Sequence, residues 1–303
     1  MSANKKFLPH WLTKHLFAYD PAHLPLDKVA ELHRKLARFR VDTPEVSIVI
    51  PAYNEEANLL NMLSSLAEQE ITRPTELLVV NNNSVDRTQE ILDACGVRSI
   101  IERKPGVAHA RQAGLMAARG KIMANADSDC LYPSGWLEAL TAPLQQPQVA
   151  CTYGLYSFLP SEKSSRISLF FYEKAAHLIN SVRNRHRAYL NVYGFNFAFR
   201  RADALAVGGF EVDSGREGSV AELIAAGAPP PPSGRCEDGL MALALLNEGK
   251  GKIWRVTSIN ARAWTSDRRL VAEGSLVKAF TKRVWHSVRD LGFYLSPSQK
   301  TPS

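Results

Sequence analysis

The sequence has 303 residues, of which 45% are hydrophobic and 22% charged, proportions that are ordinary for a folded globular protein and exclude disorder as its main state. The net charge of +7 is unevenly distributed, because residues 250–290 contain ten Lys or Arg and three Asp or Glu. This basic excess fits either a solvated face or contact with a membrane or another polyanion. No recognition motif accompanies it, so we expect no nucleic-acid partner.

The four cysteines are far apart and form no CxxC pair, so we expect neither a zinc knuckle nor a disulfide framework, and a reducing compartment. Charged and histidine residues interrupt the apolar residues near the N-terminus, which is unlike a signal peptide. No apolar run approaches the roughly 20 residues of a membrane span. We therefore expect a cytoplasmic protein, either soluble or lying peripherally on the inner face of a membrane.

Residues 1–45 are expected to form a helical extension, with a basic amphipathic helix that ends before Pro44. From residue 46 onward, short β-branched runs alternate with segments of helical periodicity. Strands are expected at 46–54, 76–84, 97–103 and 121–127, and helices at 55–69, 87–95 and 107–120. This alternation predicts an α/β fold with a doubly wound, mostly parallel sheet flanked by helices.

The pattern is less regular after Pro133. A mobile loop is expected at 213–236, because its Pro- and Gly-rich composition suits no regular element. The other expected elements are a short helix at 134–144, a strand at 149–158, a long helix with a basic end at 166–187, a strand and short helix within 193–211, a helix at 237–251 and a strand at 252–256.

Polar clusters follow three of the expected parallel strands: Tyr53 with Asn54, Asn81 to Asn83, and Asp127 with Asp129. Ligands of such sheets bind beyond the carboxyl ends of the strands, so the three clusters should converge on one crevice. Two aspartates one residue apart in a turn can share a divalent cation, since Mg²⁺ takes one or two carboxylates and completes its shell with phosphate oxygens and water. Capping or solvated turn residues are the alternative interpretation.

These segments, in this order, resemble the family 2 glycosyltransferases of the GT-A fold. The similarity runs from about Val46 to Val256 in six motifs, among them VSIVIPAYNEEANLLNMLSSLAEQ, ANADSDCLYPSGWLEAL and CEDGLMALALLNEGKG. It implies an inverting transfer of a sugar from a nucleoside diphospho-sugar, with a UDP-sugar expected first, to an acceptor hydroxyl. The implied acceptor is a glycan, a lipid-linked sugar or a small molecule in polysaccharide, glycolipid or cell-envelope glycan synthesis.

The resemblance also implies how the donor is bound. Pro51, Ala52, Tyr53 and Glu55 would line the nucleotide site, with Tyr53 near the base, and Arg111 would reach the nucleotide from its helix. Asn82 stands where the family commonly has an Asp that accepts a hydrogen bond from the base. An amide oxygen can still accept that bond, but this departure weakens the expectation of uridine.

The carboxylates receive the remaining roles by the same resemblance. Asp127 and Asp129 would hold Mg²⁺ or Mn²⁺ on the donor's diphosphate, Asp129 more directly. Asp238 stands at the position of the catalytic base, with Glu237 beside it, and the start of a helix would stabilise its charge. Helix capping is the alternative function of this acidic pair.

The implied organisation is a nucleotide-sugar-binding half at 46–155, an acceptor-binding half at 156–265, and a basic amphipathic helix and tail at 266–303. In the last segment Leu276, Phe280, Val284 and Val288 share one stripe, which either packs on the catalytic domain or lies on an anionic membrane surface. Trp264 and the following TSDRR are candidates to close over the donor's phosphates.

Two other functions compete with glycosyl transfer. A sugar nucleotidyltransferase would use a similar sheet, but no Gly-rich, Lys-bearing phosphate loop occurs near the N-terminus. A catalytically silent nucleotide- or sugar-binding module is favoured by the departure at Asn82, whereas the presence of Asp127, Asp129 and Asp238 argues for catalysis.

Overall fold

The computed structural model describes residues 7–161, 164–210 and 237–272, together with positions 278, 281, 285 and 289. The expected loop at 213–236 and the stripe of Leu276, Phe280, Val284 and Val288 lie outside these residues.

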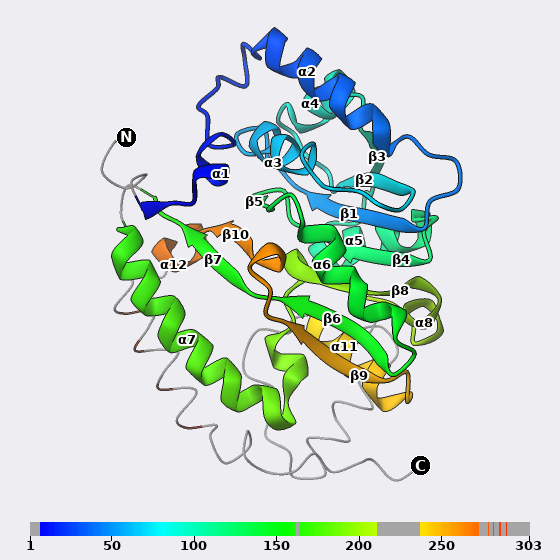
Figure 1. The fold of residues 1–303 in the computed structure, drawn as a ribbon. Coiled ribbons are helices and arrows are strands. Elements are labelled where there is room, and N and C mark those ends of the chain that lie inside the picture. Colours follow the sequence, from blue (N-terminus) through cyan, green and yellow to red (C-terminus); the bar gives the residue numbers. More distant parts are fainter. Residues whose placement is uncertain are drawn as a thin grey trace.

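A seven-stranded sheet forms the centre of the molecule, in the order β3-β2-β1-β4-β8-β6-β9 (Figure 1). Its strands are β1 Val46–Ala52, β2 Thr75–Asn81, β3 Arg98–Ile101, β4 Ile122–Asn125, β6 Val149–Gly154, β8 Phe197–Arg200 and β9 Lys252–Val256. Neighbours from β3 to β4 are parallel, as are β6 and β9, and only β8 is antiparallel to its two neighbours. The expected mostly parallel sheet is therefore confirmed.

Helices cover both faces of this sheet, and the strand sequences explain why. In β1 the side chains of Ile48 and Ile50 belong to one core cluster and that of Val49 to another, because successive side chains of a strand point to opposite faces. Both faces are apolar, as expected of parallel strands buried between two helical layers. The helices are α3 Leu59–Leu66, α4 Thr88–Ala94, α5 Val107–Ala117, α6 Trp136–Thr141, α7 Arg166–His186, α8 Arg201–Ala206, α11 Glu237–Asn247 and α12 Arg268–Ala272.

The strand expected at 149–158 is wrong in one respect, because the chain leaves the large sheet after Gly154. It continues as β7 Tyr156–Leu159, which belongs to a second sheet of order β5-β10-β7, with β5 Cys130–Leu131 and β10 Ala263–Ser266. At the break, a side chain on Gly154 would overlap Asn196 and the Ala261 carbonyl, so the backbone approaches both closely. The small sheet brings the turn that carries Asp129 next to the segment that carries Trp264.

The N-terminal residues pack onto this core. A single turn, α1 His10–Thr13, precedes α2 Leu26–Leu36 and the 3₁₀ turn η2 Ala37–Phe39. Val29, Leu32, Leu36 and Phe39 are buried in the same cluster as the side chains of β1. Four further 3₁₀ turns are η3 Ala142–Gln145, η4 Ala188–Asn191, η5 Gly194–Asn196 and η6 Ile259–Ala261.

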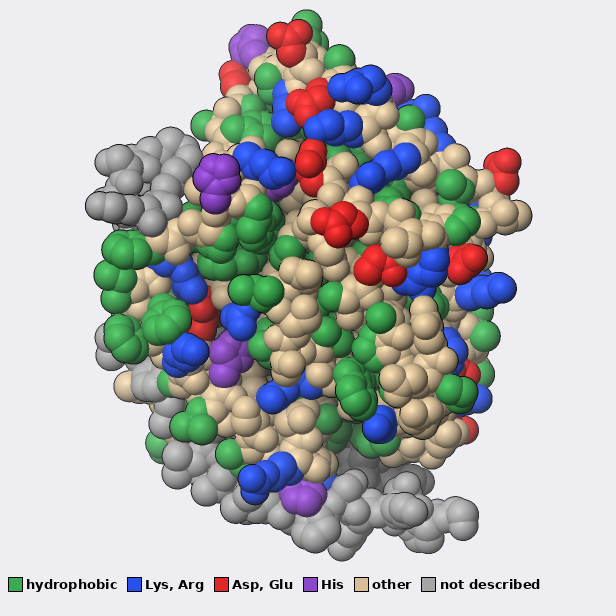
Figure 2. Space-filling model, in the orientation of Figure 1, with side chains coloured by type: hydrophobic (Ala, Val, Ile, Leu, Met, Phe, Trp, Pro, Cys, Tyr) green, Lys and Arg blue, Asp and Glu red, His purple; other side chains and the backbone are tan. Residues whose placement is uncertain are grey.

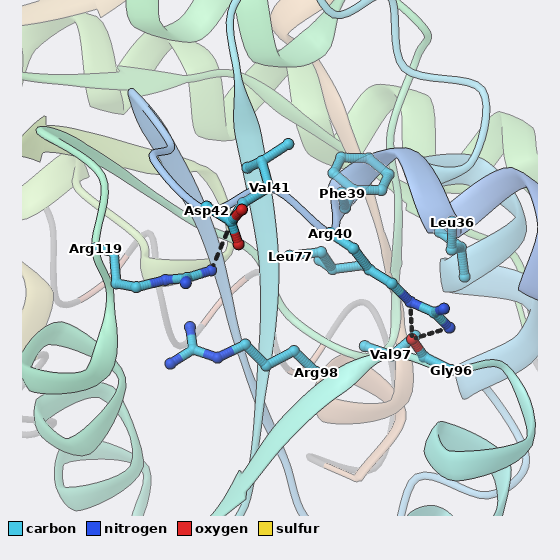
Figure 3. Close-up of a pocket in the computed structure, with 10 residues that line it drawn as sticks. All are labelled: Leu36, Phe39, Arg40, Val41, Asp42, Leu77, Gly96, Val97, Arg98 and Arg119. Carbon is cyan, nitrogen blue, oxygen red and sulfur yellow. Dashed lines mark hydrogen bonds between the residues drawn. The ribbon is translucent and has the colours of Figure 1, made fainter.

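A cavity of about 200 Å³ lies where α2 meets the amino ends of β2 and β3, away from the polar clusters at the carboxyl ends (Figure 3). Its cations already bind the protein: Arg40 donates to the carbonyl of Gly96, and Arg98 and Arg119 both bind the buried Glu76. We therefore assign this cavity a structural role. Over the described ranges, no helix combines the length and apolar character needed to cross a bilayer.

Candidate active site

The polar clusters that follow β1, β2 and β4 lie at one edge of the sheet, because these three strands are adjacent and parallel. Hydrogen bonds tie the first two clusters together: the backbone N–H of Asn54 donates to Ser84 Oγ at 3.0 Å, and Asn54 Oδ1 accepts from the N–H of Val85 at 2.9 Å. Asn54 and Asn83 have φ values of 53° and 61°, a left-handed conformation that Asn tolerates better than most residues. The expected convergence of these turns is present.

Arg111 on α5 is the centre of the site. Its side chain is 4% exposed, and Nη1 donates to both oxygens of Asp238, at 2.7 and 2.8 Å, and to Oε1 of Glu237. Nη2 donates to Asp127 Oδ1 at 3.0 Å. Burial alone would lower the pKa of Arg111, but the charges of Asp238, Asp127 and Glu237 raise it above its ordinary value. One cation therefore connects a residue expected to hold metal with the two residues expected at the base position.

Asp238, in the first turn of α11, is buried, and its Oδ2 also accepts a hydrogen bond of 2.7 Å from the backbone N–H of Gly194. A Cβ at Gly194 would overlap the guanidinium of Arg111, so only glycine allows the backbone, Arg111 and Asp238 to meet here. The turn at Gly194 therefore completes the binding of Asp238.

Asp129 belongs to a second ion-pair group, with Glu55 and Arg268. Arg268 Nη2 lies 2.8 Å from Asp129 Oδ2 and 3.0 Å from Glu55 Oε1. Burial raises the pKa of Glu55, and hydrogen bonds from Asn58 and Arg268 partly oppose that shift. Burial lowers the pKa of Arg268, but its bonds to the two carboxylates outweigh this and raise it overall. The first residues after β10 thus bind directly to the expected metal ligand.

Tyr132 fixes the start of the acidic turn. Its hydroxyl accepts a hydrogen bond of 2.9 Å from the backbone N–H of Asp127 and donates one of 3.0 Å to the carbonyl of Phe195. Burial raises the pKa of Tyr132 well above its ordinary value, so the hydroxyl keeps the proton that it donates. The turn at 127–129 is therefore anchored to the chain that precedes β8.

The donor set fits a hard divalent cation. Asp127 and Asp129 offer carboxylate oxygens on side chains that are 19% and 21% exposed, so a ligand has access to both. In the part of the chain described, five carboxylates meet two guanidinium groups here, which leaves an excess of negative charge. Among the same residues, no three His, Cys, Asp or Glu side chains group closely enough to enclose a metal by themselves. Mg²⁺ and Mn²⁺ suit such a set, because substrate phosphates can supply the remaining ligands.

The residues expected around the nucleotide differ in their exposure to solvent. Tyr53 is 60% exposed and therefore no core residue, whereas Ala52 is buried and Pro51 half-buried within β1. Asn82 is buried, and its Nδ2 donates to the carbonyls of Glu102 and Lys104 at 2.9 and 2.7 Å.

The side-chain oxygen of Asn82 is also engaged, since it accepts a hydrogen bond of 2.8 Å from the N–H of Gly106 at the start of α5. Asn82 thereby holds the loop before α5 in place. An amide oxygen has a second lone pair, so a contact with the base stays a prediction.

Two residues of the site, Gly194 and Tyr132, were not expected from the sequence. The ion pairs of Arg268 with Asp129 and Glu55 were not expected either. The sequence TSDRR did indicate that this segment approaches the donor, and the contact between Arg268 and Asp129 is consistent with that expectation. Gly194 and Tyr132 act through backbone and hydroxyl bonds to residues that are distant in the sequence, and no local pattern signals such bonds.

The chain is similar to known glycosyltransferases. A family model described as Glycosyl transferase family 2 matches residues 47–205, which is more than half of the chain. The chain is 30% identical over 155 residues to "Polypeptide N-acetylgalactosaminyltransferase 8" of Drosophila melanogaster, covering 47% of this chain and 25% of that protein. It is 32% identical over 111 residues to the uncharacterized glycosyltransferase EpsJ of Bacillus subtilis, covering 35% and 32%.

A further relative is "Undecaprenyl-phosphate 4-deoxy-4-formamido-L-arabinose transferase" of Aeromonas hydrophila, 28% identical over 171 residues, covering 53% of this chain and 50% of that protein. The chain thus matches half or less of the length of each of these relatives. Among solved structures, mannosyltransferase PcManGT from Pyrobaculum calidifontis, in complex with GDP-Man and Mn²⁺, has a TM-score of 0.53 at 19% identity, covering 86% of this chain and 72% of that one. At this identity the similarity shows a shared GT-A fold. Because the family model matches more than half of its residues, the chain belongs to glycosyl transferase family 2.

Proposed function

We propose that this protein is a metal-dependent, inverting glycosyltransferase that moves a sugar from a nucleoside diphospho-sugar to an acceptor hydroxyl. The observation that supports this most strongly is the contact of Arg111 with both Asp127 and Asp238. A proposed metal ligand and the proposed catalytic base are thereby held on the same guanidinium. This arrangement suits a single displacement, because the attacking hydroxyl and the leaving diphosphate are partly bonded to opposite sides of the same carbon in the transition state.

In this proposal Asp127 and Asp129 hold Mg²⁺ or Mn²⁺ against the donor's diphosphate. The bound cation supplies a Lewis acid for the negative charge that develops on the departing phosphate. Pro51, Ala52, Tyr53, Glu55 and Asn82 bound the nucleotide side of the site. Residues 46–155 then serve the donor and residues 156–265 the acceptor.

Asp238 accepts the proton of the acceptor hydroxyl, with Glu237 beside it. Both oxygens of Asp238 are bound by Arg111 or Gly194, and hydrogen bonds to a carboxylate disfavour its protonation. We therefore propose that Arg111 turns from Asp238 toward the donor's phosphates when the donor binds. Losing the neighbouring cation makes Asp238 a stronger base at the stage when a base is needed.

A UDP-sugar is the first candidate donor. Because Asn82 stands where the family commonly has an Asp that binds the base, donors with other nucleotides should be tested as well. The Aeromonas relative is named as a transferase acting on undecaprenyl phosphate, which supports a lipid-linked acceptor alongside glycans and small molecules. We accordingly propose a role in cell-envelope glycan, glycolipid or polysaccharide synthesis at the inner face of a membrane.

A thermal-shift panel of UDP, GDP, dTDP and CDP, each with and without Mn²⁺, tests the donor site on wild type and Asp129→Ala. A ligand at about 100 times its Kd adds roughly 2.7 kcal/mol, a shift of several degrees. We expect one nucleotide to stabilise wild type only with metal, and Asp129→Ala not at all. If no nucleotide stabilises the protein, the donor-site proposal is wrong. Stabilisation without turnover of any nucleotide-sugar would favour the silent binding module.

A further inference from the structure

The outward face of α7 carries large apolar side chains that are exposed to solvent. Ile167, Phe170, Phe171 and Leu178 are 53%, 45%, 67% and 71% exposed. Ile167, Phe171, Lys174, Leu178 and Arg185 follow one another at spacings of three, four or seven residues, so they line one face of the helix. Figure 2 shows hydrophobic side chains gathered at the left edge of the molecule, where Figure 1 places the start of α7.

The inner face of the same helix already has partners. The side chain of Arg166 is buried, binds both oxygens of Glu173 at 2.8 and 2.7 Å, and lies 5.0 Å from the ring of Trp264. Glu173 also accepts hydrogen bonds from the backbone of Phe158 and from Ser157 on β7. Among the residues that the structure describes, the packing of α7 on the protein is therefore made by its inner side, and its most exposed apolar residues lie outside that contact.

A wide groove extends this surface beyond the helix. Phe7, Leu8 and Pro9 border it on one side and Ile167, Phe170 and Phe171 on the other, around a hollow of about 660 Å³. Phe7 is 60% exposed. We call Phe7, Ile167, Phe170, Phe171 and Leu178 the α7 apolar face. Exposed apolar patches of this kind mark surfaces that bind a partner or a membrane.

The charged side chains of α7 indicate which kind of partner this face binds. The single acidic residue of α7 is Glu173, which is buried, while the exposed Lys and Arg residues are Lys174 and Arg185. Lys174 lies in the middle of the apolar side chains, with Nζ 5.3 Å from the ring of Phe170. Lysine is depleted from the cores of protein–protein interfaces, but at a bilayer its stem lies among apolar groups while its ammonium reaches the headgroups.

We propose that the α7 apolar face docks on an anionic lipid bilayer, with the aromatic and aliphatic side chains entering the interface and Lys174 and Arg185 meeting lipid headgroups. The α7 apolar face shares no residue with the C-terminal stripe of Leu276, Phe280, Val284 and Val288. Leu169 and Tyr172 on the inner side of α7 pack on Leu270 of α12, two residues after Arg268, so docking by α7 brings the carboxylate site close to the membrane surface.

The test is cosedimentation of the full chain with phosphatidylcholine vesicles, prepared with or without phosphatidylglycerol, at low and high salt. We expect binding that requires phosphatidylglycerol and weakens with salt. The double variant Phe171→Ser/Leu178→Ser should bind the vesicles at least about tenfold more weakly than wild type. Lys174→Gln should bind about fivefold more weakly, and only on the anionic vesicles. Leu26→Ser, at an exposed helical leucine on α2 (79% exposed), is the matched control and should bind as wild type.

Failure of wild type to bind anionic vesicles overturns the proposal, and so does unchanged binding by Phe171→Ser/Leu178→Ser. If Trp285→Ser, at a residue 61% exposed, abolishes binding while the double variant does not, the C-terminal segment is the anchor instead. Light scattering tests the other occupant, a second copy of this chain. A dimer that the double variant dissociates, without vesicle binding, would assign the face to self-association. The assay uses no donor, so its outcome is separate from that of the donor-site panel.

Discussion

Arg111 and Asp238 are 127 positions apart in the sequence, yet one nitrogen of the guanidinium lies 2.7 and 2.8 Å from the two carboxylate oxygens. Arg111 comes from the helix that precedes β4, and Asp238 from the first turn of a helix in the later half of the chain. The pair thus joins the two halves at the carboxyl edge of the sheet. Its removal should affect both folding and catalysis.

Arg111→Gln should lower the free energy of unfolding by about 3–5 kcal/mol, because it leaves Asp238 buried without its cation. Urea denaturation measures this change. Lys14→Gln, which breaks an exposed pair with Glu68, is the control and should cost less than about 1 kcal/mol. Equal stabilities for the two variants would show that the buried pair contributes no more to the fold than an exposed one.

Gly194→Ala should displace the guanidinium of Arg111, because the added methyl group overlaps it. We expect a loss of about 1–3 kcal/mol of stability and a larger fractional loss of sugar transfer than of nucleotide binding. In Gly135→Ala the three atoms nearest the new methyl group belong to the side chain of Asn260, at 3.1 to 3.3 Å, so this variant serves as the control. Normal transfer by Gly194→Ala would argue against the arrangement of Arg111 and Asp238 proposed for catalysis.

Arg268→Gln should change metal and nucleotide binding in opposite directions. Without nucleotide, Arg268 competes with a cation for Asp129 and Glu55, so we expect Mn²⁺ to bind about two- to fivefold more tightly to the variant. With nucleotide present, the missing cation should weaken binding of the diphosphate. Electron paramagnetic resonance of free Mn²⁺ measures the first effect, and calorimetry measures the second. Lys14→Gln, which breaks an exposed ion pair with Glu68, is the control and should bind both ligands as wild type does. Weaker Mn²⁺ binding without nucleotide would mean that Arg268 assists the metal.

His15 should make the fold sensitive to acid. It is 3% exposed, forms a hydrogen bond of 2.8 Å between Nδ1 and Ser64 Oγ, and burial, aided by Lys14, lowers its pKa from 6.5 to about 4. The folded state binds fewer protons than the unfolded state in this range, so stability is present above about pH 6.5 and is lost as the pH falls toward 4.

The expected loss through His15 is about 2–3 kcal/mol across that window. Urea denaturation at several pH values should show a flatter profile for His15→Gln than for wild type. His10→Gln, at an exposed histidine, should keep the wild-type profile. A parallel profile for His15→Gln would mean that other groups cause the acid sensitivity.

The sequence was sufficient to predict the sheet and the edge at which the site lies. The apolar runs at β1 and β2 are long and β-branched, and parallel strands place their carboxyl ends together, so Tyr53, Asn82 and Asp127 had to converge. The site's connections were not predictable in the same way. Arg111 could be expected to approach the donor, but its bonds to Asp238 and Glu237 depend on how two helices pack across the sheet.

Similar reasoning explains the break between β6 and β7. Residues 149–158 read as one strand, because apolar and aromatic residues continue through Gly154. The chain changes sheets there because the Asn196 side chain and the Ala261 carbonyl lie against Gly154. A pattern within ten residues cannot report neighbours that come from 40 and 100 residues away.

The packing of α2 has a consequence for where this protein can be cut. Homology to the family begins at residue 47, but Val29, Leu32, Leu36 and Phe39 fill the same core as Ile48 and Ile50. A fragment trimmed to the boundary of the family match would expose the apolar side chains on that side of the sheet to water and promote aggregation. The segment shared with relatives is therefore smaller than the segment that fills this core, and a truncated or exchanged domain should keep the N-terminal helix together with the central sheet.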